Sequence, residues 1–231
     1  MTPAGSGALP PAVLPAVLPP AVPMPGLPPG LPQRPYPAPV RWGARLLLAG
    51  LGVRLAGGFA DTPRAVLVGW PHTSNLDGIV AMAGVAVVGL RPTIAVKHSL
   101  FRYGLGGLMR AFGAFPLRRS APGEGGGGAV AQFTERFEAA AAAGRPLWIA
   151  VSPEGTRARG AGWRTGWHRT AVAAGVPVAV LAFDWGRSRA ERRLVALGAV
   201  ALGGDLAADT AAVEALYAGV VGRHPERATP A

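Results

Sequence analysis

The chain has 231 residues and a formal net charge of +11, and half of its residues are hydrophobic. This length and apolar content suffice for one domain with a sizeable core, with or without a tail. The absence of cysteine excludes disulfides, thiolate nucleophiles and cysteine-ligated metal sites. The positive charge favours an anionic partner. Composition alone does not decide whether that partner is nucleic acid, an acidic lipid surface or a phosphate-bearing substrate.

The first 40 residues are set apart by prolines at short intervals. Proline lacks an amide donor and clashes inside a helix, so we predict a polyproline-II-like or disordered tail over residues 1–40. A ligand for a proline-reading domain is the alternative. No Lys or Arg precedes Arg34, which argues against a signal peptide. The predicted domain therefore covers residues 41–231.

Residues 41–60 predict a short apolar helix followed by a turn. Arg45 and Arg54 bracket eight uncharged residues, too few for a membrane span of about 20. Basic residues and Trp42 around an apolar patch favour a helix lying in a membrane interface, and a helix packed on the core is the alternative. Residues 78–90 are also too short to span a membrane and predict a buried helix or a wall for an apolar substrate.

From residue 64 onward, strands and helices are expected to alternate. The predicted strands are 65–70, 93–97, 115–118, 146–151, 176–183 and 193–200. The predicted helices begin near residue 75 and then cover 101–112, 129–143, 165–174 and 209–221. This alternation predicts an α/β fold with a largely parallel central sheet flanked by helices. Ligands of such sheets bind beyond the carboxyl ends of the strands.

The segment P-H-T-S-N-L-D, residues 71–77, follows the first apolar strand and opens the next helix. A carboxylate on one ring nitrogen of His72 fixes the tautomer and leaves the other nitrogen as a base. Asp77 is positioned for this role, and the pair is a triad without its nucleophile, which suits transfer to a hydroxyl of the substrate. The alternative is that Asp77 only favours the helix N-terminus. The H-x4-D spacing is weak evidence alone.

Two further motifs follow predicted strands. The run S-P-E-G-T-R, residues 152–157, places a glycine, a hydroxyl and a guanidinium at a strand end, which suits an oxyanion or a phosphate, although a polar turn is the alternative. Arg118 and Arg119 end a short strand, where one guanidinium of the pair can bind phosphate and solvated charge is the alternative. Lys97, the chain's single lysine, also ends a predicted strand.

Together and in this order, the three motifs resemble those of the glycerolipid acyltransferase family, whose best-known members make phosphatidic acid from lysophosphatidic acid. The resemblance covers about residues 41–205 and includes a looser fourth motif, an apolar strand opened by Val176-Pro177. Two positions depart from the family's pattern. Ala158 stands where serine is usual, and Arg118 stands where an acidic residue is common, which leaves the acceptor headgroup open.

The resemblance implies that His72 is the general base on the acceptor hydroxyl and that Asp77 orients it. It also implies that Arg119 holds the acceptor phosphate with help from Arg157. The full set of predicted substrate-binding residues, to which Lys97 is added for its place at a strand end, is Arg118, Arg119, Glu154, Gly155, Thr156, Arg157 and Lys97.

The implied reaction moves a fatty acyl group from acyl-CoA or acyl carrier protein to a lysophospholipid, with lysophosphatidic acid as the expected acceptor. Such direct transfer needs no cofactor and no metal, and we expect no nucleic-acid partner. Charge and the first helix predict a protein held on the cytoplasmic face of an anionic membrane. The alternatives are a non-catalytic module that binds anionic lipid and an acyltransferase with an amino-lipid or glycolipid acceptor.

Other catalytic classes find little support. The glycine run at residues 123–128 matches G-x-G-x-x-G only because it is all but uninterrupted glycine. No G-x-S-x-G elbow and no Walker lysine is present. His98, His168 and His224 lack the spacing of metal ligands.

Overall fold

The structure, a computed structural model, describes residues 26–97, 107, 113–117, 127–155 and 159–230. Within these residues, seven strands form one sheet in the order β1-β7-β6-β2-β5-β3-β4. Only β6 and β7 pair antiparallel, and the other neighbours are parallel. The predicted fold class, an α/β fold with a largely parallel sheet, is confirmed. The strands are β1 (Arg54–Gly57), β2 (Arg64–Trp70), β3 (Thr93–Lys97), β4 (Ala114–Leu117), β5 (Leu147–Val151), β6 (Val178–Asp184) and β7 (Arg193–Val200).

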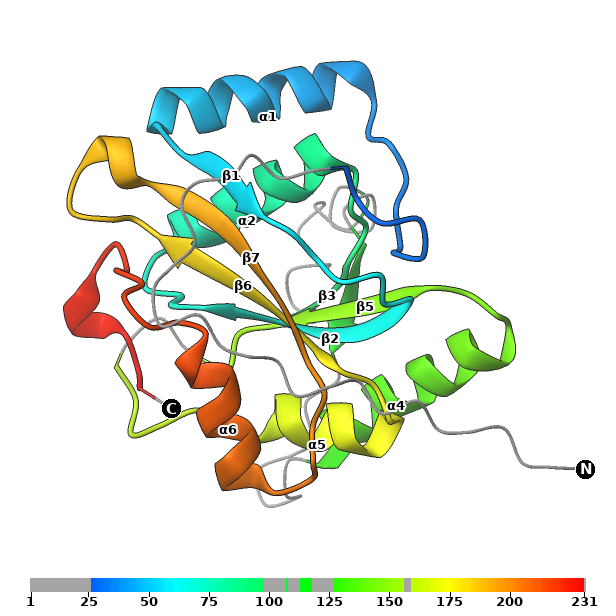
Figure 1. The fold of residues 1–231 in the computed structure, drawn as a ribbon. Helices are drawn as coiled ribbons and strands as arrows, with labels where there is room; N and C mark the ends of the chain where they lie inside the picture. The colour runs from blue at the N-terminus through cyan, green and yellow to red at the C-terminus, as the bar shows by residue number, and fades with distance from the viewer. Residues whose placement is uncertain (1–25, 98–106, 108–112, 118–126, 156–158, 231) are drawn as a thin grey trace, which may run out of the picture.

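Helices cover both faces of the sheet (Figure 1). On one face α2 lies against the strands, and α1 packs on α2 as an outer layer. On the opposite face lie α4, α5 and α6. The helices are α1 (Ala38–Leu51), α2 (Asn75–Val88), α4 (Gly127–Ala142), α5 (Gly166–Ala174) and α6 (Leu206–Ala215), with short 3-10 turns η2 (Arg189–Glu191) and η3 (Pro225–Arg227).

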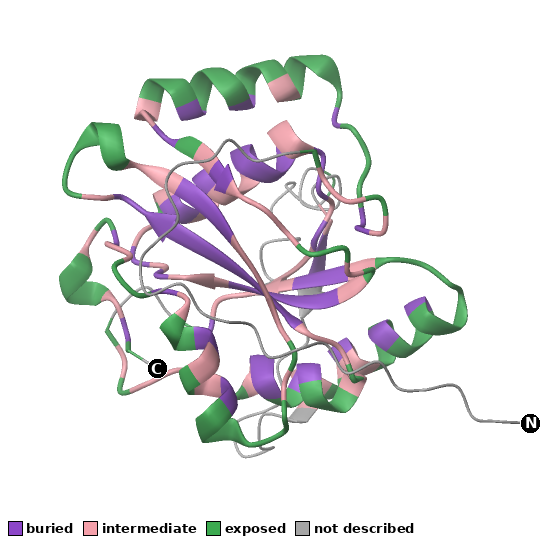
Figure 2. Cartoon of the chain, in the orientation of Figure 1, coloured by how far each residue is buried: buried purple, intermediate pink, exposed green. Residues whose placement is uncertain are grey.

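The central strands divide the core into two layers. Along β2, Leu67 packs with the α1 and α2 side chains, whereas Val66 and Val68 pack with those of α4 and α5. Every residue of β6 is buried, because both of its faces are covered (Figure 2). The helix predicted over 129–143 is present as α4, and its Phe133 and Phe137 lie in the second layer. The central residues of the strands therefore form the core, whereas the residues after the strand ends are available for a functional site.

The structure corrects the predicted domain boundary at residue 40. Leu31 is 1% exposed and Tyr36 is 4% exposed, so this part of the proline-rich segment belongs to the core. Arg34 donates its backbone N–H to Gly89 at the end of α2. Folded structure thus begins before residue 41, because apolar side chains between the prolines have an apolar surface to cover. Residues 1–25 lie outside the described residues.

Two other elements differ from the prediction. Residues Arg54–Gly57, predicted within a helix and turn, form edge strand β1 against β7. The last helix covers Leu206–Ala215, several residues earlier than predicted, because the Asp205 side chain caps the N–H of Ala208. The predicted helix at 101–112 falls almost wholly outside the described residues.

Candidate active site

The carboxyl ends of three neighbouring strands bring the site together. Strands β6, β2 and β5 are adjacent and parallel, so their carboxyl ends lie at one edge of the sheet. His72 follows β2, Glu154 follows β5 and Trp185 follows β6 directly. His72 and Glu154, 82 residues apart in sequence, therefore meet at one edge, where ligands of such sheets bind.

A hydrogen bond joins the H-x4-D motif to the E-G-T-R motif. The backbone N–H of His72 donates to Oε2 of Glu154 at 2.6 Å. The second carboxylate oxygen, Oε1, accepts the backbone N–H of Thr229 at 2.9 Å. Glu154 is only 2% exposed. Its carboxylate therefore holds the backbone of His72, two residues after the end of β2.

Burial raises the pKa of Glu154 above its ordinary value. The N–H groups of Thr229 and His72 oppose that rise, and the negative charge of Asp77 adds to it. The folded protein therefore binds this proton more tightly than the unfolded chain does. As pH rises from the ordinary glutamate pKa through the folded value, ionisation of Glu154 lowers the free energy of unfolding.

Asp77 is fully buried, and both of its oxygens accept hydrogen bonds. Oδ2 accepts the backbone N–H groups of Thr73 at 2.8 Å and Ser74 at 2.7 Å. Oδ1 accepts the indole N–H of Trp185 at 2.7 Å. A carboxylate in this first turn also complements the dipole of α2. Asp77 thus locks the loop after β2 to the helix that follows and to the end of β6.

The imidazole of His72 lies between β6 and the start of α2. Its ring centroid is 5.9 Å from that of Phe183. A Cβ placed on Gly78 would lie 3.6 Å from His72 Cε1, so the ring rests on the first turn of α2. That turn also carries Asp77. The direct orientation of the imidazole by the Asp77 carboxylate stays a prediction.

Gly155 of the E-G-T-R motif is exposed and adopts a positive φ of 63°. A side chain is strained in this region, and a Cβ would also meet the Arg164 side chain at 3.1 Å. The glycine therefore lets the chain turn sharply after Glu154. The remaining residues of this motif, Thr156 and Arg157, lie outside the described residues.

The predicted phosphate-binding arginines, Arg118 and Arg119, also fall outside the described residues, directly after β4 ends at Leu117. Lys97 is the last residue of β3, and its backbone pairs with Leu117. Since β3 and β4 are parallel to β5, both end at the same edge as the site. The roles of Arg118, Arg119 and Lys97 in substrate binding stay predictions.

Sequence patterns assigned no role to three residues that hold the site. Trp185 and Thr73 bond the Asp77 carboxylate, and Thr229 bonds Glu154. Trp185 directly follows an apolar strand, which placed it at the right edge without indicating a partner. Thr229 lies in a stretch with no motif at all.

Two histidines outside the motifs have structural partners. His168 Nε2 lies 2.8 Å from Oδ2 of Asp209 in a buried pair between α5 and α6. Burial tends to raise the pKa of Asp209, but hydrogen bonds from Gly203, His168 and Gly204 lower it overall. His224 lies 3.6 Å from Glu226. In the described part of the chain, no group of three or more His, Asp or Glu side chains could hold a metal ion.

The sequence profile of the family described as Acyltransferase matches residues 58–184. This is more than half of the chain, and it contains both the H-x4-D motif and the E-G-T-R motif. The chain belongs to the acyltransferase family. The family recognised from the three motifs is thereby confirmed. The matched region of the acyltransferase runs from the end of β1 to the end of β6, so α1, β7, α6 and the C-terminal segment lie outside it.

Among solved structures, the acyltransferase is similar to the crystal structure of the 1-acyl-sn-glycerophosphate (LPA) acyltransferase, PlsC, from Thermotoga maritima. The identity is 16%, the TM-score is 0.44, and the match covers 70% of this chain. It covers 66% of the PlsC chain, just under two thirds of that protein's length. No curated protein sequence matches the chain.

Proposed function

We propose that this acyltransferase moves a fatty acyl group from acyl-CoA or acyl carrier protein to the hydroxyl of a lysophospholipid. The proposed acceptor is lysophosphatidic acid, which would give phosphatidic acid. The observation that carries the proposal is the hydrogen bond from His72 N–H to Glu154, which unites the two motifs at one strand edge. No protein nucleophile is required, because the acceptor hydroxyl attacks directly.

The proposed reaction has two steps. The His72 imidazole takes the proton of the acceptor hydroxyl while its oxygen attacks the thioester carbonyl carbon and forms a C–O bond. The tetrahedral intermediate then collapses, the C–S bond breaks, and the proton passes from the imidazolium to the departing sulfur. The products are the new ester and the free thiol, so protons and electrons balance without a further reactant.

Positive charge near the site supports an anionic acceptor. The guanidinium groups of Arg192 and Arg223 lie 5.5 and 5.3 Å from the ring centroid of Trp185, which itself bonds Asp77. Their charge acts at the same edge of the sheet as His72. The proposed phosphate ligands are Arg119 and Arg157, with Arg118, Lys97, Glu154, Gly155 and Thr156 completing the site.

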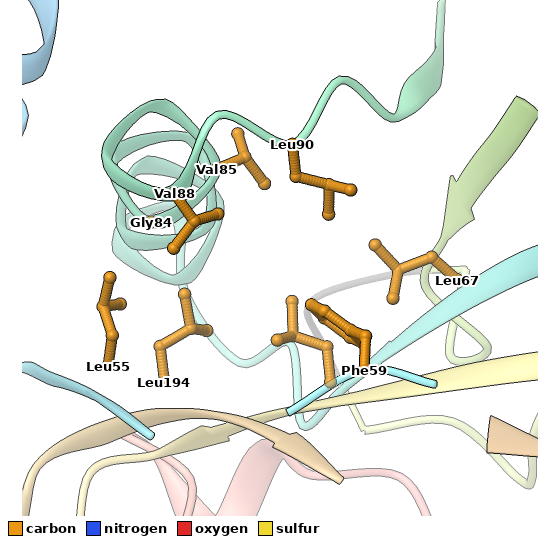
Figure 3. A pocket seen from close by; sticks show the side chains of 9 residues that line it. Leu55, Phe59, Leu67, Gly84, Val85, Val88, Leu90 and Leu194 are labelled. Atoms are coloured by element: carbon orange, nitrogen blue, oxygen red, sulfur yellow. The ribbon is translucent and has the colours of Figure 1, made fainter. Parts of the chain in front are cut away.

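A small hollow lies between α2 and the sheet. It is lined only by hydrophobic side chains and Gly84 (Figure 3). Gly84, Val85 and Val88 of α2 face Leu194 and Phe59 across it. Residues 78–90 were predicted to be a buried helix or a wall for an apolar substrate, and Gly84, Val85, Val88 and Leu90 of this range line the hollow.

The function is tested by acyl transfer with purified protein in detergent micelles. Acyl-CoA and acyl carrier protein donors are each offered with lysophosphatidic acid, an uncharged lysoglycolipid and an amino-lipid. We expect turnover with lysophosphatidic acid that exceeds turnover with the uncharged acceptor. Preference for another acceptor would replace the proposed substrate, and no transfer with any pair would leave a non-catalytic lipid-binding module as the better account.

We also propose that α1 holds the enzyme against the cytoplasmic face of an anionic membrane. Among the described helices, none is both long and apolar enough to cross a bilayer. Trp42 is 63% exposed and Leu46 is 64% exposed, one turn apart on the outer side of α1, with Arg45 beside them. An apolar stripe flanked by cations suits the interface of an anionic bilayer.

The end of α1 lies near the proposed site. Arg189 of η2, which follows β6, donates to the carbonyl oxygens of Ala49 and Gly50 at 3.2 and 2.5 Å. Arg192 donates to the carbonyl of Leu51 at 2.8 Å. The helix therefore ends against the segment that follows Trp185, so a membrane under α1 would bring lipid acceptors close to His72.

Replacing both Trp42 and Leu46 with serine is expected to weaken binding to phosphatidylglycerol-containing vesicles by at least about tenfold. The reason is that burying one large apolar side chain is worth roughly 1.5–3 kcal/mol. Cosedimentation at low and high salt measures the effect. Val172→Ser on α5, where the valine is 45% exposed, is the matched control and should bind like the unmodified protein. Equal binding by both variants, or no binding by the unmodified protein, would refute the proposal.

A further inference from the structure

Residues 221–229, here called the C-terminal strap, pass along the site from outside the region matched by the family profile. The backbone N–H of His224 donates to Thr73 Oγ1 at 3.2 Å. Gly222 lies so close to the H-x4-D loop that a Cβ there would be 2.9 Å from Pro71 Cγ. The strap therefore rests on the same loop that carries His72.

Thr229 connects this strap to the second motif. It is fully buried, and its backbone N–H donates to Glu154 Oε1 at 2.9 Å. Its carbonyl oxygen accepts the indole N–H groups of Trp70 at 2.9 Å and Trp163 at 3.0 Å. Its hydroxyl accepts the backbone N–H of Gly160 at 2.8 Å. Donors from two segments, the end of β2 and the stretch before α5, thus fix the position of a single backbone N–H.

The Glu154 carboxylate connects Thr229 to His72. One oxygen accepts Thr229 N–H and the other accepts His72 N–H, so the three groups form a continuous chain. A glutamate side chain has several rotatable bonds, and its ordering costs conformational entropy. A donor held rigidly on the far side selects the one rotamer that also reaches His72. Burial raises the pKa of Glu154, and the hydrogen bond from the Thr229 N–H acts in the opposite direction.

We propose that Thr229 is a positioning residue for acyl transfer: it holds Glu154 in the rotamer that fixes the His72 backbone, and so sets the place of the catalytic imidazole. The proposal rests on the proposed function, in which His72 is the base. It assigns a role in catalysis to a segment outside the family profile. A displacement of about 1 Å at a catalytic group can cost up to about a hundredfold in rate.

The test is Thr229→Val, which keeps the shape of the side chain and removes the hydroxyl acceptor from Gly160. We expect kcat to fall about tenfold while the KM values for donor and acceptor change less than about twofold. Thr229→Ser keeps the hydroxyl and is expected to restore most of kcat. Trp163→Phe removes one donor to the Thr229 carbonyl, should lower kcat in the same direction, and serves if Thr229→Val fails to fold.

The matched control is Thr170→Val. Thr170 is 1% exposed in α5, so the same change is made in another buried position that lacks a hydrogen bond to the site. This variant should keep the kcat of the unmodified protein. A similar loss of kcat in Thr170→Val and Thr229→Val would mean that general loosening of the fold, and not the strap, is responsible, and would overturn the proposal.

Hydrogen exchange separates this proposal from the proposed function. The His72 amide should exchange faster in Thr229→Val than in Thr170→Val, whether or not the substrate is correct. Unchanged exchange together with unchanged kcat would overturn the positioning role even if acyl transfer depends on His72. Faster exchange in a protein that transfers no acyl group would support the link from Thr229 to His72 and refute the function alone.

Discussion

Replacing His72 with alanine is expected to lower kcat for acyl transfer by about 10²–10⁴-fold, the usual contribution of a positioned general base. The imidazole is the group that removes the hydroxyl proton in the proposed reaction. Its removal leaves donor and acceptor contacts intact, so KM should change little. The side chain is only partly buried, so we expect the variant to fold. Initial rates with the preferred donor and acceptor measure the effect.

The control for this variant is Ile79→Ala on the neighbouring turn of α2, where the isoleucine is 49% exposed. It should retain the rate of the unmodified protein. His72→Ala with full turnover would exclude His72 as the base and would require another group at this edge of the sheet. A pH–rate profile adds a second check, because the rate should fall as pH drops through the pKa of the imidazole and the base becomes protonated.

The fold and the place of the site could be predicted because their signals are local. Apolar runs such as β2 and β6 identify buried strands, and alternation with helices predicts parallel pairing. Parallel pairing then brings His72 and Glu154 to one edge without any knowledge of their contact. The motif order identified the family, which the profile over residues 58–184 confirms.

What could not be predicted depends on contacts between distant residues. Thr229 bonds Glu154 across 75 residues, and Trp185 bonds Asp77 across 108. Neither residue stands in a local pattern that indicates a partner. The tail boundary was wrong for a related reason: proline composition predicts the absence of helix, but it does not reveal that Leu31 has an apolar surface to cover.

Asp77→Asn is the second large effect that we expect. The carboxylate accepts three short hydrogen bonds in a fully buried place, whereas an amide offers a single acceptor oxygen and turns an NH₂ group toward a donor. Hydrogen bonds to a buried charge are worth roughly 1.5–3 kcal/mol each, so the free energy of unfolding should fall by about 3 kcal/mol. Urea unfolding at neutral pH measures it.

Trp185→Phe separates two roles of Asp77, stabilising the fold and orienting His72. It removes one donor from Oδ1 and keeps the packing at the end of β6, so it should cost about 1–2 kcal/mol of stability. If Asp77 also orients His72, kcat of folded Asp77→Asn should fall at least about a hundredfold, while Trp185→Phe should retain most of its activity. Equal small losses in both variants would restrict Asp77 to holding the start of α2, and His72 would then be oriented through its backbone by Glu154 alone.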